Sequence, residues 1–193
     1  MHVIIYVPSH NIIKNEVIDL PWYGSHPYLT EYIREQKCRK IMEVGVYNGN
    51  NAVTMVEAAI QNVAPQEVEY YGFDFFSHYS TREVGIKLEK LGCKFRLFQG
   101  NTLDTLPKAV DALPKMDLIF IDGGKSFKVA ESDWQNSRQL MHFRSGVFVH
   151  NAGFSGVRKM VERISRAEHQ VDVFHARYEG LVAFIKKRRA RVR

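Results

Sequence analysis

The sequence has few cysteines and no long apolar run. Its 193 residues include two cysteines, Cys38 and Cys93, which form no CxxC pair. Two reduced, partly buried thiols fit this pattern better than a disulfide framework or a cysteine-ligated metal. No stretch of about 18 apolar residues occurs, so no membrane span is expected. The apolar residues 3–7 follow no basic leader, which argues against a signal peptide and for a cytoplasmic protein.

The sequence also lacks internal repeats, low-complexity segments and linkers that would divide it into several domains. Hydrophobic residues make up 45% and charged residues 25%, which is typical of a soluble globular protein. The net charge is +6, and much of it lies in residues 186–193, KKRRARVR. This basic tail is either a solvated chain end or an anchor for RNA, phosphate or an acidic membrane surface. A charge run alone is weak evidence, so a nucleic-acid partner is not favoured.

The most informative stretch is residues 41–51, IMEVGVYNGNN. A short apolar run leads into Gly45, a polar loop ends at Gly49, and an Ala/Val/Met-rich helical pattern begins at Asn50. The pattern predicts a strand, a glycine turn and a helix. Glycine tolerates a positive φ and lets a ligand approach bare backbone, while the helix N-terminus offers free N–H groups. The stretch therefore favours a nucleotide-like ligand.

Two common nucleotide-binding loops do not fit. A dinucleotide fingerprint needs glycines at relative positions one, three and six, but counting from Gly45 the second and third of these are tyrosine and asparagine. Residues 119–126, IFIDGGKS, approach a phosphate loop, yet Ile119 stands where its first glycine is required. What remains is a Glu-x-Gly-x-x-x-Gly pattern that begins at Glu43.

Strand-like and helix-like segments alternate along the rest of the chain. After the first strand, strands are predicted at 68–76, 94–101, 116–124 and 146–153, and helices at 50–62, 79–91, 103–113, 126–141 and 156–164. The last two strands lie within residues 171–187 and are joined by a tight turn at Tyr178, Glu179 and Gly180. This alternation predicts an α/β fold that is Rossmann-like and doubly wound. We expect a mostly parallel seven-stranded sheet with helices on both faces and a C-terminal antiparallel hairpin.

The chain divides into three parts on this interpretation. Residues 1–39 form an N-terminal strand or arm, at residues 3–7, and a covering helix that starts near Pro27. Residues 40–187 form the main domain, and residues 188–193 form the end of the basic tail.

Polar groups follow the predicted strands, where open α/β sheets bind their ligands. Asp74 ends the second strand, and a carboxylate there can accept both hydroxyls of a ribose. Asn101 and Thr102 follow the third strand and suit either an adenine contact or a helix N-cap. Asp122 follows the fourth strand, and His150 follows the fifth.

These motifs resemble a known family. Glu43, Gly45 and Gly49 resemble the first motif of class I S-adenosylmethionine-dependent methyltransferases. The sequence FIDGG, followed by a polar residue, Ser126 and an aromatic residue, resembles the fourth motif of the methyltransferase family 24 group. That group often has a histidine where this chain has Lys125. The resemblance covers about residues 40–187.

The resemblance implies how S-adenosylmethionine, or its product S-adenosylhomocysteine, would bind. Glu43 would fix the loop or meet the methionine amino group. Asp74 would hold the ribose, and Asn101 or Thr102 the adenine. Asp122 would face the methionine amino group or the substrate. The residues implied around the methionine end are Glu43, Gly45, Val46, Tyr47, Asn48 and Gly49.

The catalytic candidates are Asp122 and His150, since methyl transfer to a hydroxyl or amine requires loss of a proton and imidazole titrates near neutral pH. His150 could equally close a strand end. By resemblance, Asp122, His150 and Asn151 could hold a divalent metal. An imidazole suits Mg2+ poorly, and Zn2+ or Mn2+ is no better supported, so a metal is not favoured.

The sequence therefore predicts an S-adenosylmethionine-dependent methyltransferase that acts on a small-molecule hydroxyl or amine. One alternative is a nucleotide-binding or interaction domain with reduced catalysis. Two departures from the family pattern would favour it, Lys125 and Asn151, since relatives often have His-Asp where this chain has His150-Asn151. Another is an RNA methyltransferase that uses the basic tail. Homo-oligomerisation is left open.

Overall fold

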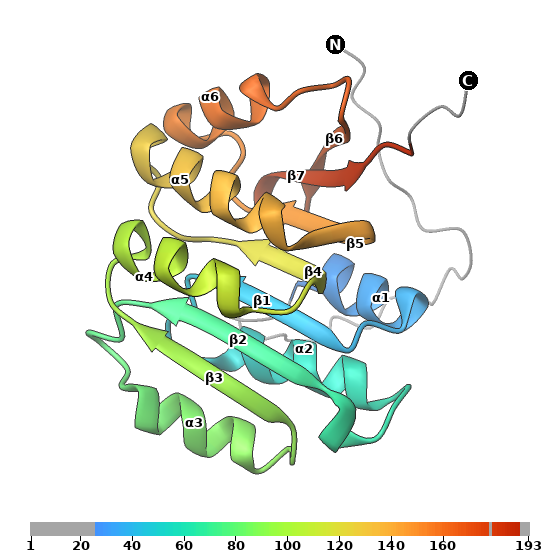
Figure 1. Ribbon diagram of the computed structural model, residues 1–193, viewed down its shortest axis with the longest axis vertical. Helices are drawn as coiled ribbons and strands as arrows, with labels where there is room; N and C mark the ends of the chain where they lie inside the picture. The colour runs from blue at the N-terminus through green and yellow to red at the C-terminus, as the bar shows by residue number, and fades with distance from the viewer. Residues whose placement is uncertain (1–25, 178, 190–193) are drawn as a thin grey trace.

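The computed structural model describes residues 26–177 and 179–189. The strand predicted at residues 3–7 lies outside this part of the chain. Seven strands and six α-helices alternate within it (Figure 1). The strands are β1 (Lys40–Val44), β2 (Glu69–Asp74), β3 (Lys94–Gln99), β4 (Met116–Ile121), β5 (Met141–Val149), β6 (His169–Ala176) and β7 (Gly180–Lys187). The helices are α1 (Pro27–Gln36), α2 (Asn50–Ile60), α3 (Thr81–Glu89), α4 (Thr102–Ala109), α5 (Phe127–Ser137) and α6 (Ser155–Arg163).

All seven strands form one sheet in the order β3-β2-β1-β4-β5-β7-β6. Strands β1 to β5 run parallel to one another, whereas β7 is antiparallel to both β5 and β6. The predicted fold, a mostly parallel doubly wound sheet with a C-terminal antiparallel hairpin, is confirmed. Strand order reverses between β1 and β4, which is where such sheets bind ligands.

The helices cover both faces of the sheet because successive strand residues point to opposite sides. Figure 1 shows α4, α5 and α6 in front of the sheet and α2 behind it. Met42 and Val44 of β1 pack with the apolar residues of α4, α5 and α6 in one core cluster. Ile41 of β1 packs with the apolar residues of α1, α2 and α3 in the other. The same alternation turns Glu43 toward α2.

Strand β5 differs from its prediction at both ends. It begins at Met141, five positions before the predicted start, because residues 142–145 form an irregularity in the register against β4. The backbone N–H of His142 donates to the Ser145 hydroxyl across this irregularity. The strand ends at Val149, since Asn151 has a φ of 54° and lies in a turn.

The described part of the basic tail is bound to the domain. The Lys187 ammonium donates to the carbonyl of Met141 at 2.8 Å, and the Arg188 backbone N–H donates to the carbonyl of Glu168 at 2.8 Å. These charges therefore also hold the end of β7 in place. None of the helices in residues 26–177 and 179–189 is long and apolar enough to cross a membrane.

Candidate active site

The glycine loop, residues 45–49, joins β1 to α2 at the carboxyl edge of the sheet. Gly45 and Gly49 have φ angles of 94° and 75°, and Tyr47 has a φ of 52°. A Cβ on Gly45 would lie 2.4 Å from the carbonyl oxygen of Asp122. Glycine is therefore required at position 45 because the glycine loop meets the loop after β4 backbone to backbone. This packing reason differs from the predicted approach of a ligand, and cofactor contact at Gly45 stays a prediction.

Asp74 ends β2 and holds the glycine loop through its carboxylate. Its Oδ2 accepts hydrogen bonds from the N–H groups of Val46 and Tyr47, at 2.8 and 2.9 Å. Its Oδ1 accepts one from the N–H of Phe76 at 2.9 Å. Each carboxylate oxygen can accept about two hydrogen bonds, so Oδ1 has capacity for one more donor. The predicted bond to a ribose hydroxyl fits this geometry and stays a prediction.

Glu43 of β1 joins this strand to α2 and β2 next to the glycine loop. It is 1% exposed, and its Oε1 accepts a hydrogen bond from Asn51 Nδ2 of α2 at 2.7 Å. The Tyr70 hydroxyl of β2 donates to its Oε2. Burial raises the pKa of Glu43 to about 8, although these two hydrogen bonds act in the opposite direction. Both roles that the resemblance implied for Glu43, fixing the loop and meeting the methionine amino group, stay predictions.

Asn101 is the N-cap of α4, because its Oδ1 accepts a hydrogen bond from the N–H of Leu103 at 3.1 Å. Thr102 is the first residue of that helix and is buried. The capping alternative is therefore observed for Asn101. The adenine contact predicted for Asn101 or Thr102 stays a prediction.

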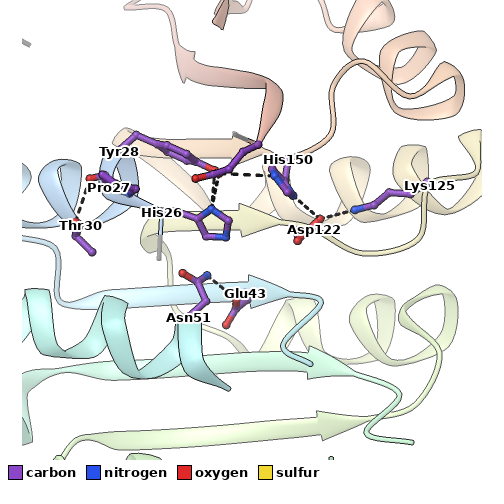
Figure 2. A network of polar contacts seen from close by, with 10 residues as sticks. His26, Pro27, Tyr28, Thr30, Glu43, Asn51, Asp122, Lys125 and His150 are labelled. Atoms are coloured by element: carbon purple, nitrogen blue, oxygen red, sulfur yellow. Dashed lines mark hydrogen bonds and ion pairs between the residues drawn. The ribbon is translucent and has the colours of Figure 1, made fainter. Parts of the chain in front are cut away.

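Asp122 lies between Lys125 and His150 at the end of β4. Its Oδ1 contacts the Lys125 ammonium and lies 2.9 Å from Nδ1 of His150 (Figure 2). Burial opposes ionisation of Asp122, but the adjoining His150 and the Lys125 charge outweigh it and hold its pKa below the usual value. Asp122 is thus a carboxylate at neutral pH. Lys125, which replaces the family's frequent histidine, is its ion-pair partner.

His150 is buried at the carboxyl end of β5 with unsatisfied ring nitrogens. Neither Nδ1 nor Nε2 makes a hydrogen bond within the described chain, although both atoms are buried. The 2.9 Å contact with Asp122 has the length of an ion pair but not the angles of a hydrogen bond. Nε2 lies 3.7 Å from Glu179 Oε2. A buried imidazole without hydrogen bonds is costly, so its retention here favours contact with a ligand.

Three residues that the sequence analysis did not select surround His150. His26 precedes α1, and its Nδ1 lies 2.6 Å from Oε2 of Glu179 in the turn between β6 and β7. The Tyr28 hydroxyl donates to the same oxygen at 3.0 Å. Figure 2 shows His26, Tyr28 and His150 close together, with Asp122 beside His150. No sequence spacing points to this group, because His26 and Glu179 are 153 positions apart and meet only through the fold.

The structure therefore gathers a set of possible metal ligands that differs from the one implied by resemblance. Ligand atoms of His26, His150 and Glu179 all lie within 4.8 Å of one another. Asn151, a member of the predicted alternative, has a left-handed backbone in the turn after β5. Its carbonyl accepts a hydrogen bond from the N–H of Phe154 at 2.9 Å.

Comparisons with known proteins bear on this site and fold. A family model described as a methyltransferase domain matches residues 42–152, more than half of the chain. The O-methyltransferase TomG from Streptomyces achromogenes, involved in tomaymycin synthesis and solved with S-adenosylmethionine, superposes with a TM-score of 0.68 at 17% identity. The match covers 83% of this chain and 78% of TomG.

Two further solved structures are similar. A putative O-methyltransferase from Klebsiella pneumoniae has a TM-score of 0.71 at 15% identity, over 88% of this chain and 84% of that one. The O-methyltransferase from Bacillus cereus, solved with S-adenosylhomocysteine, has a TM-score of 0.70 at 16% identity, over 88% of this chain and 85% of that one. A search of curated protein sequences finds no match.

The strand order, the glycine loop and the acidic end of β2 define a class I S-adenosylmethionine-dependent methyltransferase. This confirms the class that the sequence motifs resembled. Since the family model covers residues 42–152, the chain belongs to methyltransferase family 24.

Proposed function

We propose that the protein transfers a methyl group from S-adenosylmethionine to a hydroxyl group of a small molecule. The observation that carries this proposal is His150, whose buried ring nitrogens lack hydrogen bonds beside the ionised Asp122. Both residues lie at the carboxyl edge of the sheet, next to the glycine loop. A hydroxyl or an amine acceptor must lose a proton, which this pair can accept. The similarity to O-methyltransferases favours a hydroxyl.

The cofactor would lie across the glycine loop and the end of β2. S-adenosylmethionine supplies a methyl group on a sulfonium, which is already a strong electrophile. Asp74 would bind a ribose hydroxyl with the remaining capacity of Oδ1, because its other bonds fix it against the loop. The backbone of residues 46–48 would line the methionine end. These residues place the cofactor, so the chain's main chemical task is to orient the acceptor and remove its proton.

His150 is the group that we assign to the acceptor's proton. Its Nδ1 is beside Asp122 Oδ1, which leaves Nε2 as the nitrogen that can face an acceptor. When the imidazole takes a proton, the carboxylate of Asp122 stabilises the resulting charge, as in other carboxylate–imidazole pairs. Asp122 therefore contributes through its charge and its contact with His150 rather than as the base itself.

The solved neighbours support a hydroxyl acceptor without defining it. TomG and the Bacillus cereus protein are both O-methyltransferases. Their identity to this chain is below 20%, so they support the reaction type and leave the acceptor to be found by screening.

Calorimetric titration with S-adenosylhomocysteine tests the cofactor assignment, with NAD and ATP as controls. Selective binding of S-adenosylhomocysteine is expected. If NAD or ATP binds as well or better, the cofactor assignment is wrong.

A screen of hydroxylated small molecules, monitored by formation of S-adenosylhomocysteine, then tests the chemistry. In His150→Gln, turnover should fall by roughly 100-fold or more, the usual contribution of a general base. Affinity for S-adenosylhomocysteine should be unchanged. His175→Gln, which alters an exposed histidine of β6, is the matched control. Full turnover in His150→Gln would remove His150 from the mechanism, and cofactor binding without turnover on any acceptor would favour a binding domain instead.

A further inference from the structure

Three side chains from distant parts of the chain converge beside the proposed acceptor site. Glu179 lies in the turn between β6 and β7. His26 lies just before α1 and His150 just after β5 (Figure 2). His26 Nδ1 is 2.6 Å from Glu179 Oε2, and His150 Nε2 is 3.7 Å from the same oxygen. We refer to these three residues as the His-His-Glu cluster.

The spacing of the cluster approaches that of a metal site. Nitrogen and oxygen ligands lie about 2.0–2.2 Å from Zn2+, so two ligands of a tetrahedral site are roughly 3.3–3.6 Å apart. The two measured separations, 2.6 and 3.7 Å, lie on either side of that range. All three ligand atoms are within 4.8 Å of one another. Side-chain shifts of about 1 Å or less would bring the two measured pairs to coordination distance.

The surroundings of His150 resemble those of a metal-ligating histidine. Such a histidine usually places its second ring nitrogen against a carboxylate, which fixes the ring and makes the ligating nitrogen more basic. Here Nδ1 of His150 is 2.9 Å from Asp122, while Nε2 faces Glu179. Neither nitrogen makes a hydrogen bond within the described chain. A metal on Nε2 would satisfy that nitrogen, and a small rotation would complete the bond from Nδ1 to Asp122.

The other two cluster residues are also held in place. The His26 ring lies 4.9 Å from the ring of Phe120 and 5.3 Å from that of His150, measured between centroids. Glu179 accepts a hydrogen bond from the Tyr28 hydroxyl at 3.0 Å. The side chains of His26 and Glu179 are 12% and 18% exposed, so the cluster is shielded from solvent yet not closed. A preorganised and partly open group of this kind suits a bound cation with one coordination position left for a ligand.

We propose that His26, His150 and Glu179 bind one divalent transition-metal cation of the zinc class. Two imidazoles and one carboxylate suit Zn2+ and similar cations, whereas Mg2+ prefers oxygen ligands throughout. This ligand set differs from the trio of Asp122, His150 and Asn151 that the family resemblance implied. It shares His150 with that trio and contains His26 and Glu179 in place of the other two residues.

The position of this cation would deepen the proposed function, and that part of the inference rests on it. An acceptor hydroxyl in the open coordination position would lose its proton to solvent more readily, since a bound cation lowers the pKa of a coordinated oxygen. His150 would then act through the cation rather than by taking the proton itself. Metal binding itself can be measured without any acceptor.

The test is titration of the full-length protein, freed of metal by chelation, with Zn2+ in a calorimeter. We expect one Zn2+ per chain with a Kd of about 1 μM or tighter. His26→Ala and Glu179→Gln should each weaken binding by roughly 100-fold or more, because each removes a ligand. His175→Ala is the control for adventitious binding to an exposed imidazole and should bind as the unaltered protein does. Glu179→Gln preserves the side-chain shape, so it separates loss of a ligand from loss of folding.

The outcomes separate this inference from the proposed function. A stoichiometry well below one, or affinity unchanged in both Glu179→Gln and His26→Ala, would overturn the metal site. S-adenosylhomocysteine is titrated into the same samples without Zn2+. If it binds while Zn2+ does not, the methyltransferase proposal stands with His150 as the base and the metal site is refuted. If Zn2+ binds at the cluster while S-adenosylhomocysteine does not, the metal site stands and the methyltransferase proposal is refuted.

Discussion

Glu43→Gln should change how the stability of the protein depends on pH. Glu43 is a buried carboxyl whose pKa is raised by burial from 4.5 to about 8. Between these values the folded protein keeps a proton that the unfolded chain has released. The folded state therefore binds more protons, and the free energy of unfolding falls as pH rises through this window. The contribution of Glu43 is fully present below pH 4.5 and lost above about pH 8.

The size of the effect follows from the shift. A shift of 3.5 pKa units, the difference between 4.5 and about 8, corresponds to about 5 kcal/mol as an upper bound. Relaxation around a buried charge reduces such values, so we expect about 2–4 kcal/mol. Glutamine has no charge to bury. Its amide can still pair with the Tyr70 hydroxyl and with Asn51, whose Oδ1 is buried without a hydrogen bond among the described residues.

Urea unfolding followed by circular dichroism at about pH 5, 6.5 and 8 measures this difference. The unaltered protein should lose about 2–4 kcal/mol relative to Glu43→Gln between the lowest and highest pH. Glu57→Gln, an exposed carboxylate on the same helix as Asn51, is the matched control and should leave the pH dependence unchanged. Parallel curves for the unaltered protein and Glu43→Gln would show that Glu43 ionises freely in the folded protein and would refute the argument.

Three further changes test other parts of the site. Asp74→Ala should weaken S-adenosylhomocysteine binding roughly tenfold or more, by about 1.5–3 kcal/mol, and equal affinity in calorimetry would mean that the ribose is held elsewhere. Gly45→Ala should cost more than about 2 kcal/mol in urea unfolding, because its Cβ would lie 2.4 Å from a backbone oxygen; unaltered stability would contradict the backbone contact. Asp133→Asn should raise the melting temperature above pH 6. Asp133 of α5 is buried, and burial raises its pKa to about 6, so the folded protein loses stability as this carboxyl ionises above that pH. An unchanged melting temperature at pH 8 would count against that burial cost.

The positions of the glycine loop and of Asp74 at the strand ends could be predicted from the sequence because their signals are local. Gly45 and Gly49 mark the turn, and Asp74 ends an apolar strand at a fixed distance from it. Parallel strands carry their ends to one edge, so residues at successive strand ends meet without knowledge of distant contacts. The sequence could not predict which groups form hydrogen bonds with the Asp74 and Glu43 carboxylates. Asp74 binds the backbone of the glycine loop, and Glu43 binds Tyr70 and Asn51.

The acceptor half was not predictable in the same way. His26 and Glu179 occupy a pre-helix position and a hairpin turn, where neither periodicity nor spacing marks them. They meet because β7 enters the sheet between β5 and β6, which carries the preceding turn to the end of β5. The start of β5 was misplaced for a related reason. The irregularity against β4 places polar residues inside β5. These residues break the alternation of apolar and polar positions, so the sequence pattern left them outside the predicted strand.

The hairpin of β6 and β7 makes one side of the site locally less stable than the other. β7 pairs with β5 at three positions, Val147 with Ile185, Phe148 with Phe184 and Val149 with Ala183, while β6 is the outer strand of the sheet. Glu179 is carried by this hairpin, whereas the glycine loop rests on β1 at the centre of the sheet. A hairpin at the edge opens at lower free energy than central strands do, so its amides should exchange with solvent deuterons faster than those of β1. Detachment of the hairpin would uncover His150 while Glu43 and Asp74 kept the cofactor half intact. Acceptors could then enter and products leave through an opening in the sheet edge, with the bound cofactor undisturbed.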